Sequence, residues 1–91
     1  MAATVKLPKF GLTMEEATIN EWSVAVGEEV EQGQTLATIE SEKVEIELPS
    51  PVAGIVAEHL LAPGVTVPVG TPVAVLVADR DELALYRAKG A

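Results

Sequence analysis

An internal repeat restricts the fold of this chain more than any other feature. Residues 17–40 align with residues 54–77 without a gap, and the motif Gly-x-x-Val-x-x-Gly begins in register at Gly27 and at Gly64. Glycines commonly mark positions where the backbone turns, so the shared motif predicts two similar halves related by a pseudo-two-fold axis. The alternative is a chance alignment, because Val and Gly are frequent in this chain.

Short apolar segments separated by Gly and Pro recur along the chain. Valine and isoleucine far outnumber the single Phe, Trp and Tyr, and β-branched side chains favour pleated strands. Strands are expected over residues 4–7, 17–22, 35–40, 44–48, 54–61 and 73–78, with two very short strands near Val30 and Val67. Eight short strands separated by turn signals predict an all-β sandwich or barrel.

The length of 91 residues corresponds to one small domain, which we assign to residues 1–79. Residues 80–91 differ in character, because acidic residues at their start are followed by basic residues. This order of charges is typical of a short helix, but a tail or the start of a linker would have a similar composition. Residues 80–91 are therefore treated as a separate C-terminal segment.

The charge of the chain and its lack of cysteine exclude several classes of function. A net charge of -8 disfavours nucleic acid and anionic membranes as partners, since binding to either requires Lys and Arg. The absence of cysteine excludes a disulfide framework, a thiolate metal site and a cysteine nucleophile. The first residues lack the apolar run of a signal peptide, and residues 73–78 are too few to cross a bilayer, so we expect a cytoplasmic protein.

The polar residues form no recognisable catalytic or metal-binding set. His59 is the single histidine and lies in an expected strand, where an ordinary structural role is the simplest interpretation. Glu45 and Glu47 alternate with apolar residues, which places both carboxylates on the solvent side of a strand. No catalytic or metal-ligating residue is predicted, and the chain by itself is not expected to be an enzyme.

Lys43 is set apart by its position. Between Phe10 and Asp79 it is the single Lys or Arg among many acidic residues. Ser41, Glu42 and Lys43 separate two expected strands, and so short a connection predicts a tight hairpin with the lysine at its tip. An amine at this place is accessible to a modifying enzyme, although an isolated surface lysine more often only increases solubility.

Four spaced motifs lie between residues 5 and 77. They are Leu-Pro-Lys-Phe-Gly-Leu-Thr-Met from Leu7, Gly-Glu-Glu-Val-Glu-Gln-Gly from Gly27, Ile-Glu-Ser-Glu-Lys-Val from Ile39 and Pro-Ser-Pro-Val-Ala-Gly from Pro49. In this order they resemble the lipoyl domains of 2-oxo acid dehydrogenase acyltransferases, which are members of the biotinyl/lipoyl attachment family. The resemblance implies a flattened barrel of two four-stranded antiparallel sheets with pseudo-two-fold symmetry, in agreement with the repeat.

The resemblance also implies that Lys43 is amide-linked to lipoic acid. The lipoyl group would act as a swinging arm between a thiamine-diphosphate dehydrogenase, an acyltransferase and a flavin-containing dihydrolipoyl dehydrogenase, carrying acyl groups and electrons. A lipoate ligase, or a lipoyl synthase and transferase, would attach the group. The domain is therefore expected to be part of a dihydrolipoamide acyltransferase.

By the same resemblance, the loop of Phe10, Gly11, Leu12, Thr13 and Met14 lies beside the lipoyl lysine and helps the thiamine enzyme to recognise its carrier. The alternative is an ordinary surface loop with one anchoring hydrophobic residue. Residues 11–16 are similar to acyltransferases of pyruvate and acetoin complexes, a similarity too weak to identify the substrate.

The residues that flank Lys43 depart from the usual family triplet, Asp-Lys-Ala. Glu42 replaces the aspartate and caps a turn less well, so Ser41 is expected to supply part of the capping, while Val44 favours the start of a strand. A biotin carrier would show Met-Lys-Met, which these residues do not match either. The alternatives are therefore a biotin carboxyl carrier domain and an unmodified lipoyl-like interaction module, which need not have a lysine at the tip.

Overall fold

The structure, a computed structural model, describes residues 2–12, 14–42 and 44–90, and within these ranges the chain forms eight strands and one helix. Their bounds are β1 Ala3–Lys6, β2 Glu16–Trp22, β3 Glu29–Val30, β4 Thr35–Ser41, β5 Val44–Pro49, β6 Gly54–His59, β7 Thr66–Pro68, β8 Pro72–Val77 and α1 Arg80–Gly90. The prediction of eight short strands is confirmed, and each of the six longer strands begins and ends within two residues of its expected bounds.

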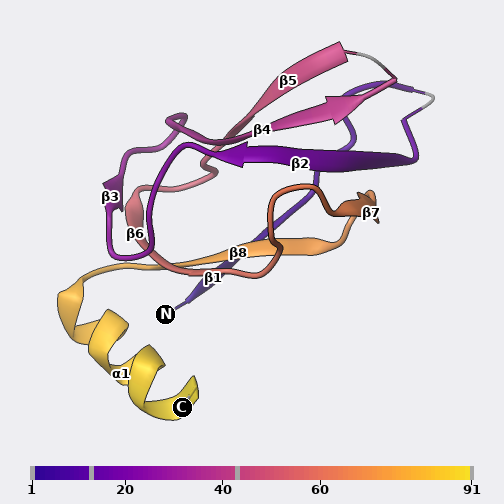
Figure 1. Cartoon of the computed structure of the whole chain (residues 1–91). Helices are drawn as coiled ribbons and strands as arrows, with labels where there is room; N and C mark the ends of the chain where they lie inside the picture. The colour runs from indigo at the N-terminus through magenta and orange to yellow at the C-terminus, as the bar shows by residue number, and fades with distance from the viewer. Residues whose placement is uncertain (1, 13, 43, 91) are drawn as a thin grey trace.

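The strands form two antiparallel four-stranded sheets that pack against each other (Figure 1). One sheet has the order β1-β8-β6-β3 and the other β5-β4-β2-β7. The repeat relates the two sheets, because β2, β3 and β4 of the first copy correspond to β6, β7 and β8 of the second. Exchanging these labels matches three strands of each sheet in order, and β1 and β5, which lie outside the repeat, occupy the fourth, equivalent positions at the edges beside β8 and β4. The predicted pseudo-two-fold relation is confirmed.

The shared glycines occupy equivalent turns in the two halves. Gly27 and Gly64 have φ angles of 93° and 90°, a region in which a residue with a Cβ atom is strained. Their backbone N–H groups donate to the carbonyls of Val56 and Ile19 respectively, each over 2.7 Å. Since Ile19 and Val56 are themselves aligned in the repeat, the two halves share hydrogen bonds as well as strand order.

The main core lies between the two sheets and consists of aliphatic side chains. Its largest fully buried members are Leu7, Ile19, Leu36, Ile39, Leu48, Val56, Val73 and Leu76. These side chains come from both halves of the chain, and their burial at close-packed density holds the strands of one sheet in fixed register with the other. Because Ile39 and Leu48 belong to β4 and β5, the same core positions the β4–β5 hairpin.

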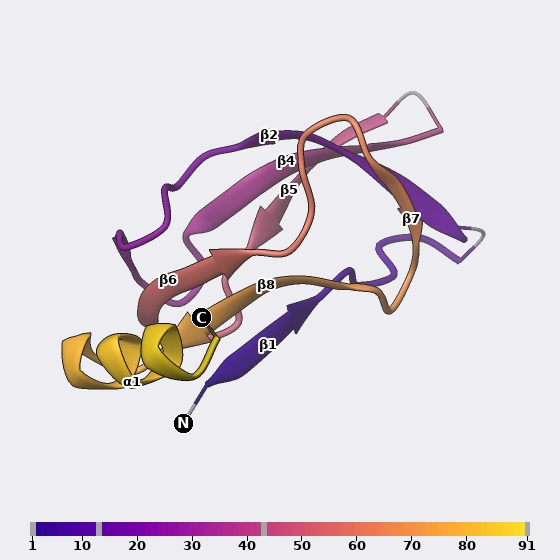
Figure 2. The same ribbon diagram turned by 60° about the horizontal axis from the view of Figure 1, so that its bottom comes forward.

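A second, smaller apolar cluster lies on the outer face of the β1-β8-β6-β3 sheet, where α1 packs (Figure 2). Leu83 of α1 is only 2% exposed. Its buried neighbours on the strands are Ile55, Ala57, Val75 and Val77. The helix begins with a side-chain cap, because the Asp79 carboxylate accepts a hydrogen bond from the Glu82 N–H over 2.8 Å. Of the two alternatives for this segment, the structure has the helix.

The molecule is elongated, with principal extents of 39 × 25 × 19 Å. The β4–β5 hairpin reaches one end of the long axis, and α1 lies at the other end (Figures 1 and 2). In the described part of the chain, no helix has the length and apolar character that crossing a membrane requires.

Candidate functional site

The β4–β5 hairpin closes tightly at its exposed end. Ser41 and Val44 form the last pair of the ladder, so two residues connect the strands. Glu42, the first of them, has a φ of 51°, and a positive φ at this position is required in the two-residue turns that hairpins prefer. Lys43, the predicted attachment residue, lies outside the described residues. Its chain neighbours Glu42 and Val44 are both exposed.

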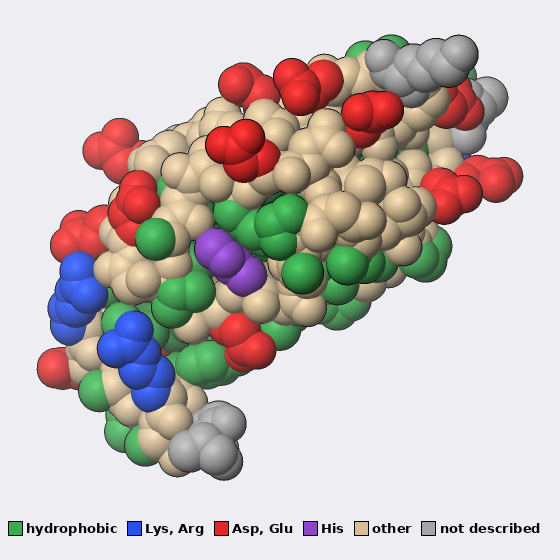
Figure 3. Space-filling model, viewed as in Figure 1, with side chains coloured by type: hydrophobic (Ala, Val, Ile, Leu, Met, Phe, Trp, Pro, Cys, Tyr) green, Lys and Arg blue, Asp and Glu red, His purple; other side chains and the backbone are tan. Residues whose placement is uncertain are grey.

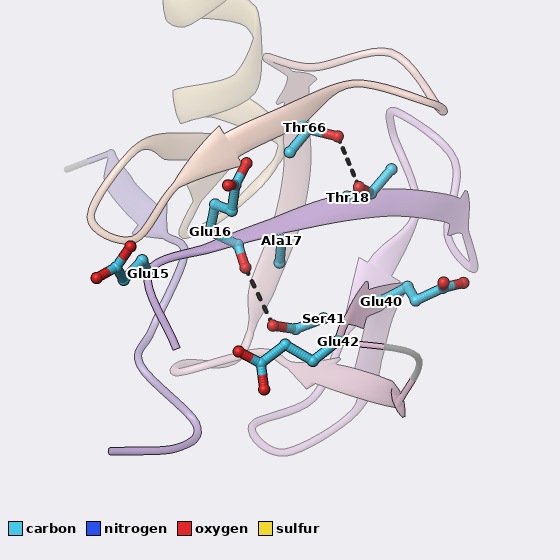
Figure 4. Close-up of a pocket in the computed structure, with 8 residues that line it drawn as sticks. All are labelled: Glu15, Glu16, Ala17, Thr18, Glu40, Ser41, Glu42 and Thr66. Carbon is cyan, nitrogen blue, oxygen red and sulfur yellow. Dashed lines mark hydrogen bonds between the residues drawn. The ribbon is translucent and has the colours of Figure 1, made fainter. Parts of the chain in front are cut away.

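Ser41 attaches the end of the hairpin to the neighbouring strand β2. Its hydroxyl donates to the backbone carbonyl of Glu16 over 3.1 Å (Figure 4). This hydrogen bond runs across the sheet, because Ser41 is part of β4 and β4 pairs with β2. The hydroxyl thus holds the base of the turn against β2. The expected part of Ser41 in capping the turn stays a prediction, because Lys43 lies outside the described residues.

The β5 strand is less buried than its alternating sequence predicts. Glu45 and Glu47 are exposed, as expected, and Leu48 is buried. Ile46 is only half-buried and Val44 is 57% exposed, although both lie on the apolar side of the strand. The difference arises because β5 is an edge strand and Val44 is its end residue, so few neighbours are available to cover it.

Described residues of the loop that precedes β2 share a cleft with residues at the end of the hairpin. This cleft of about 160 Å³, here named the apolar cleft, is lined by Phe10, Gly11, Met14, Ser41, Glu42, Val44 and Ile46. Met14 is buried, and its sulfur accepts a hydrogen bond from the Phe10 N–H over 3.3 Å. Leu12 is 96% exposed, and Thr13 lies outside the described residues. The loop thus has one anchoring residue, Met14, and presents Leu12 to solvent.

A second cleft lies along β2 beside the hairpin and is rich in carboxylates (Figure 4). This acidic cleft, of about 350 Å³, is lined by Glu15, Glu16, Ala17, Thr18, Glu40, Ser41, Glu42 and Thr66. None of these described lining residues carries a positive charge. Acidic side chains are also spread over the face in Figure 3, whereas Lys and Arg gather beside α1. The surroundings of the tip therefore disfavour anionic ligands.

Several residues that line the two clefts were not among the predicted site residues, among them Glu15, Glu16 and Ile46. Glu16 is the first residue of β2, which pairs with β4, and Glu15 directly precedes it, while Ile46 belongs to β5 on the other side of β4. Their partners lie far away in the sequence or across a turn, so composition alone does not single them out. The only sequence signal is that Glu15 and Glu16 directly follow the predicted recognition loop.

His59 lies in β6, as predicted, and stacks on Trp22 at the end of β2 that is distant from the hairpin tip. The ring centroids are 4.0 Å apart and the ring planes differ by 3°. Burial lowers the pKa of His59 below its ordinary value, and a hydrogen bond with the Val24 backbone partly opposes this shift. Among the described residues, no cluster of three or more His, Asp or Glu side chains has an arrangement that could hold a metal ion.

Comparisons with known proteins relate the chain to modules of larger enzymes. The family model described as "Biotin-requiring enzyme" matches residues 3–76. The chain is 39% identical over 82 residues to the dihydrolipoyllysine-residue acetyltransferase component of the pyruvate dehydrogenase complex of Corynebacterium glutamicum, covering 90% of this chain and 12% of that protein. It is 36% identical over 82 residues to the corresponding component of the acetoin cleaving system of Bacillus subtilis, covering 90% of this chain and 20% of that protein.

Solved structures that are similar to this chain include an isolated lipoyl domain and a much larger carboxylase. The lipoyl domain of the 2-oxoglutarate dehydrogenase complex from Azotobacter vinelandii matches with a TM-score of 0.66 and 28% identity, covering 81% of this chain and 94% of that one. The urea carboxylase of Kluyveromyces lactis matches with a TM-score of 0.72 and 27% identity, covering 85% of this chain and 6% of that one. The chain thus spans a small part of its curated relatives and nearly the whole of an isolated lipoyl domain.

Proposed function

Because the chain belongs to the biotin/lipoyl attachment family, whose model matches residues 3–76, we propose that it is a lipoyl carrier domain with lipoic acid amide-linked to Lys43. The observation that carries the proposal is the tight end of the β4–β5 hairpin. Ser41 and Val44 close the ladder around two residues, and the second of these in the sequence is Lys43. The exposure of the two chain neighbours, Glu42 and Val44, supports access by a modifying enzyme and by several active sites.

The described residues at the turn fit a lysine that carries a lipoyl group. The Ser41 hydroxyl donates to the Glu16 carbonyl, and this hydrogen bond fixes the end of β4, from which the turn begins, against β2. Glu42 and Val44 leave both sides of the turn open to a modifying enzyme. When bound, the lipoyl group supplies a dithiolane that takes up acyl groups and electrons and passes them on. The chain itself supplies position, accessibility and recognition.

The proposed partners are the enzymes between which a lipoyl carrier transfers acyl groups and electrons. The curated relatives are components of pyruvate dehydrogenase complexes and acetoin cleaving systems, and these names support a thiamine-diphosphate dehydrogenase, an acyltransferase core and a dihydrolipoyl dehydrogenase. A carrier tethered within such an assembly raises the effective concentration of the acyl group at each active site. We assign a part in recognition to residues 10–14, because Leu12 is almost fully exposed and Phe10, Gly11 and Met14 line the cleft at the hairpin.

The test is to modify the full chain in vitro. The protein is incubated with lipoate, ATP and a lipoate ligase, and in parallel with biotin, ATP and a biotin ligase, and the products are analysed by intact mass and peptide mapping. Lys43→Gln removes the proposed amine, and Lys9→Gln is the matched control, because Lys9 is exposed and lies on another segment. We expect one lipoyl adduct on the wild type and on Lys9→Gln, and none on Lys43→Gln.

Other outcomes of this test separate the remaining functions. A biotin adduct on Lys43 without a lipoyl adduct would identify a biotin carrier, the function that the flanking Glu42 and Val44 do not favour. Absence of both adducts would identify an interaction module that carries no cofactor. The proposed role is supported only by a lipoyl adduct on the wild type and on Lys9→Gln together with its absence on Lys43→Gln.

A further inference from the structure

We propose that the apolar cleft beside the turn is a docking site for the dithiolane ring of the lipoyl group, so that the arm rests on its own domain between partners. This inference depends on the proposed attachment at Lys43. It goes further, because it gives the domain a binding site for the group as well as an attachment point. The residues proposed to contact the ring are Phe10, Met14, Val44 and Ile46.

The first argument is the exposure of apolar side chains around this cleft. Val44 is 57% exposed and Phe10 39% exposed, and they face the same cleft from different segments of the chain. Each exposes an apolar surface to water, and covering that surface with an apolar ligand is favourable. The fold does not bury these side chains, although Met14 and Leu48 close by are buried.

The second argument is the size and chemistry of the cleft. Its volume is about 160 Å³, and a cavity of about 150 Å³ lined by aliphatic and aromatic side chains is known to accept a six-membered carbon ring. A dithiolane has a five-membered ring, so the cleft is large enough for it. The ring is uncharged and polarisable, and sulfur makes favourable contacts with aromatic rings such as that of Phe10.

The third argument is the position of the cleft relative to the attachment point. Glu42 and Val44, the two chain neighbours of Lys43, both line the cleft, so a long flexible arm attached between them can fold back into it. A short flexible tether gives an effective concentration of about 1 mM, so an intrinsic affinity of the same order leaves about half of the arms docked. Such a balance protects the group while keeping it available to partners.

The charge around the tip selects this occupant over others. Glu42 lines both clefts, and Glu15, Glu16 and Glu40 lie in the acidic cleft beside it. These carboxylates repel an anionic ligand and a second copy of this chain, which has a net charge of -8. A neutral group that is covalently attached at the turn is not repelled by these carboxylates.

The experiment compares the lipoylated wild type with Val44→Thr, which keeps the shape of the side chain and adds a hydroxyl in the cleft. Val52→Thr is the matched control, because Val52 is also exposed, at 41%, and does not line the cleft. Attachment is verified by intact mass for each protein. A soluble phosphine then reduces the lipoyl disulfide to two thiols, with water supplying the two protons and the oxygen of the phosphine oxide that forms. The loss of dithiolane absorbance gives the rate.

We expect reduction of Val44→Thr to be about twofold faster than that of the wild type and of Val52→Thr, because about half of the wild-type arms would be docked and protected. In the NMR spectrum of the lipoylated wild type, the Phe10 ring and the Ile46 methyl groups should show contacts with the dithiolane protons. The spectrum of each variant also reports whether the domain remains folded.

The outcomes distinguish this inference from the proposed function. A lipoyl adduct on Lys43 with equal reduction rates in all three proteins, and without contacts to Phe10 or Ile46, overturns docking and leaves the carrier function intact. Failure of the wild type to accept lipoate overturns the carrier function and docking with it. Faster reduction of Val44→Thr together with the contacts to Phe10 supports docking.

Discussion

At the scale of single residues, the Trp22–His59 stack joins the two halves of the molecule. The two residues are aligned in the repeat, so the stack brings together equivalent positions of the two copies. The Trp22 Nε1–H donates to the Leu61 carbonyl over 2.9 Å, and His59 forms a hydrogen bond with the backbone of Val24, the residue aligned with Leu61. Each ring is thus held by the opposite half of the chain.

The stack makes the stability of the domain depend on pH. Burial lowers the pKa of His59 below its ordinary value of 6.5, and its Nε2 atom is buried without a hydrogen-bond partner among the described residues. The unfolded chain therefore binds the proton more readily, so the stabilisation is complete above pH 6.5 and is lost as pH falls from there through the folded pKa. We expect the midpoint of urea unfolding, followed by the fluorescence of Trp22, to decrease over this range.

The control for this prediction is His59→Phe, which retains a flat ring but cannot be protonated. The part of the pH dependence that belongs to His59 should be absent in this variant, and any remaining slope belongs to the carboxylates. If the wild type and His59→Phe lose stability in parallel below pH 6.5, His59 does not cause the loss.

At the scale of elements, α1 and β8 depend on each other. Residues 73–77 of β8 are all buried, which requires cover on both faces of the strand. The core between the sheets covers one face, and α1 covers part of the other through Leu83. A continuous apolar run is typical of a strand that is buried on both faces, and residues 73–78 form such a run.

Removal of the Leu83 side chain should therefore destabilise the whole domain. Leu83 is 2% exposed, and truncation of a buried leucine to alanine costs at least about 2 kcal/mol of the free energy of unfolding. Leu85 is 61% exposed in the same helix, so Leu85→Ala should change that free energy by less than about 0.5 kcal/mol. Urea unfolding of the two variants measures the difference, and equal effects would show that α1 does not stabilise the sheet.

At the scale of the whole molecule, the two halves are interleaved. Each sheet contains a short strand from the other copy of the repeat, because β3 joins β6 and β7 joins β2. In addition, β1 pairs with β8, so the first and last strands lie side by side. Neither copy of the repeat can complete a sheet or cover its apolar face alone.

We therefore expect the two halves to fold only together. A cut between Val52 and Ala53 lies in an exposed bend and gives fragments 1–52 and 53–91, which hold β1 to β5 and β6 to α1. Each fragment alone should show no cooperative unfolding by circular dichroism, and an equimolar mixture should regain the strand signal of the intact chain. Cooperative unfolding of fragment 1–52 alone would contradict the interleaved fold as the source of stability.

Local sequence was sufficient to predict much of this protein. Strand positions depend on β-branched residues and on glycine and proline turns, which act over a few residues, so all eight strands were expected in the correct places. The repeat predicted the symmetry, since aligned glycines adopt the same positive φ in both halves. The short connection around Lys43 predicted the tight end of the β4–β5 hairpin for the same local reason.

What only the tertiary structure decided is which of these residues meet and which are left exposed. Val44 and Ile46 follow the pattern of a buried face, yet they line an open cleft because β5 is an edge strand. Glu15 and Glu16 line the cleft beside the hairpin, and the Ser41 hydroxyl donates to the Glu16 carbonyl on the neighbouring strand. Exposure and pairing depend on partners that are distant in the sequence, so alternation and composition specify the strands but not their neighbours.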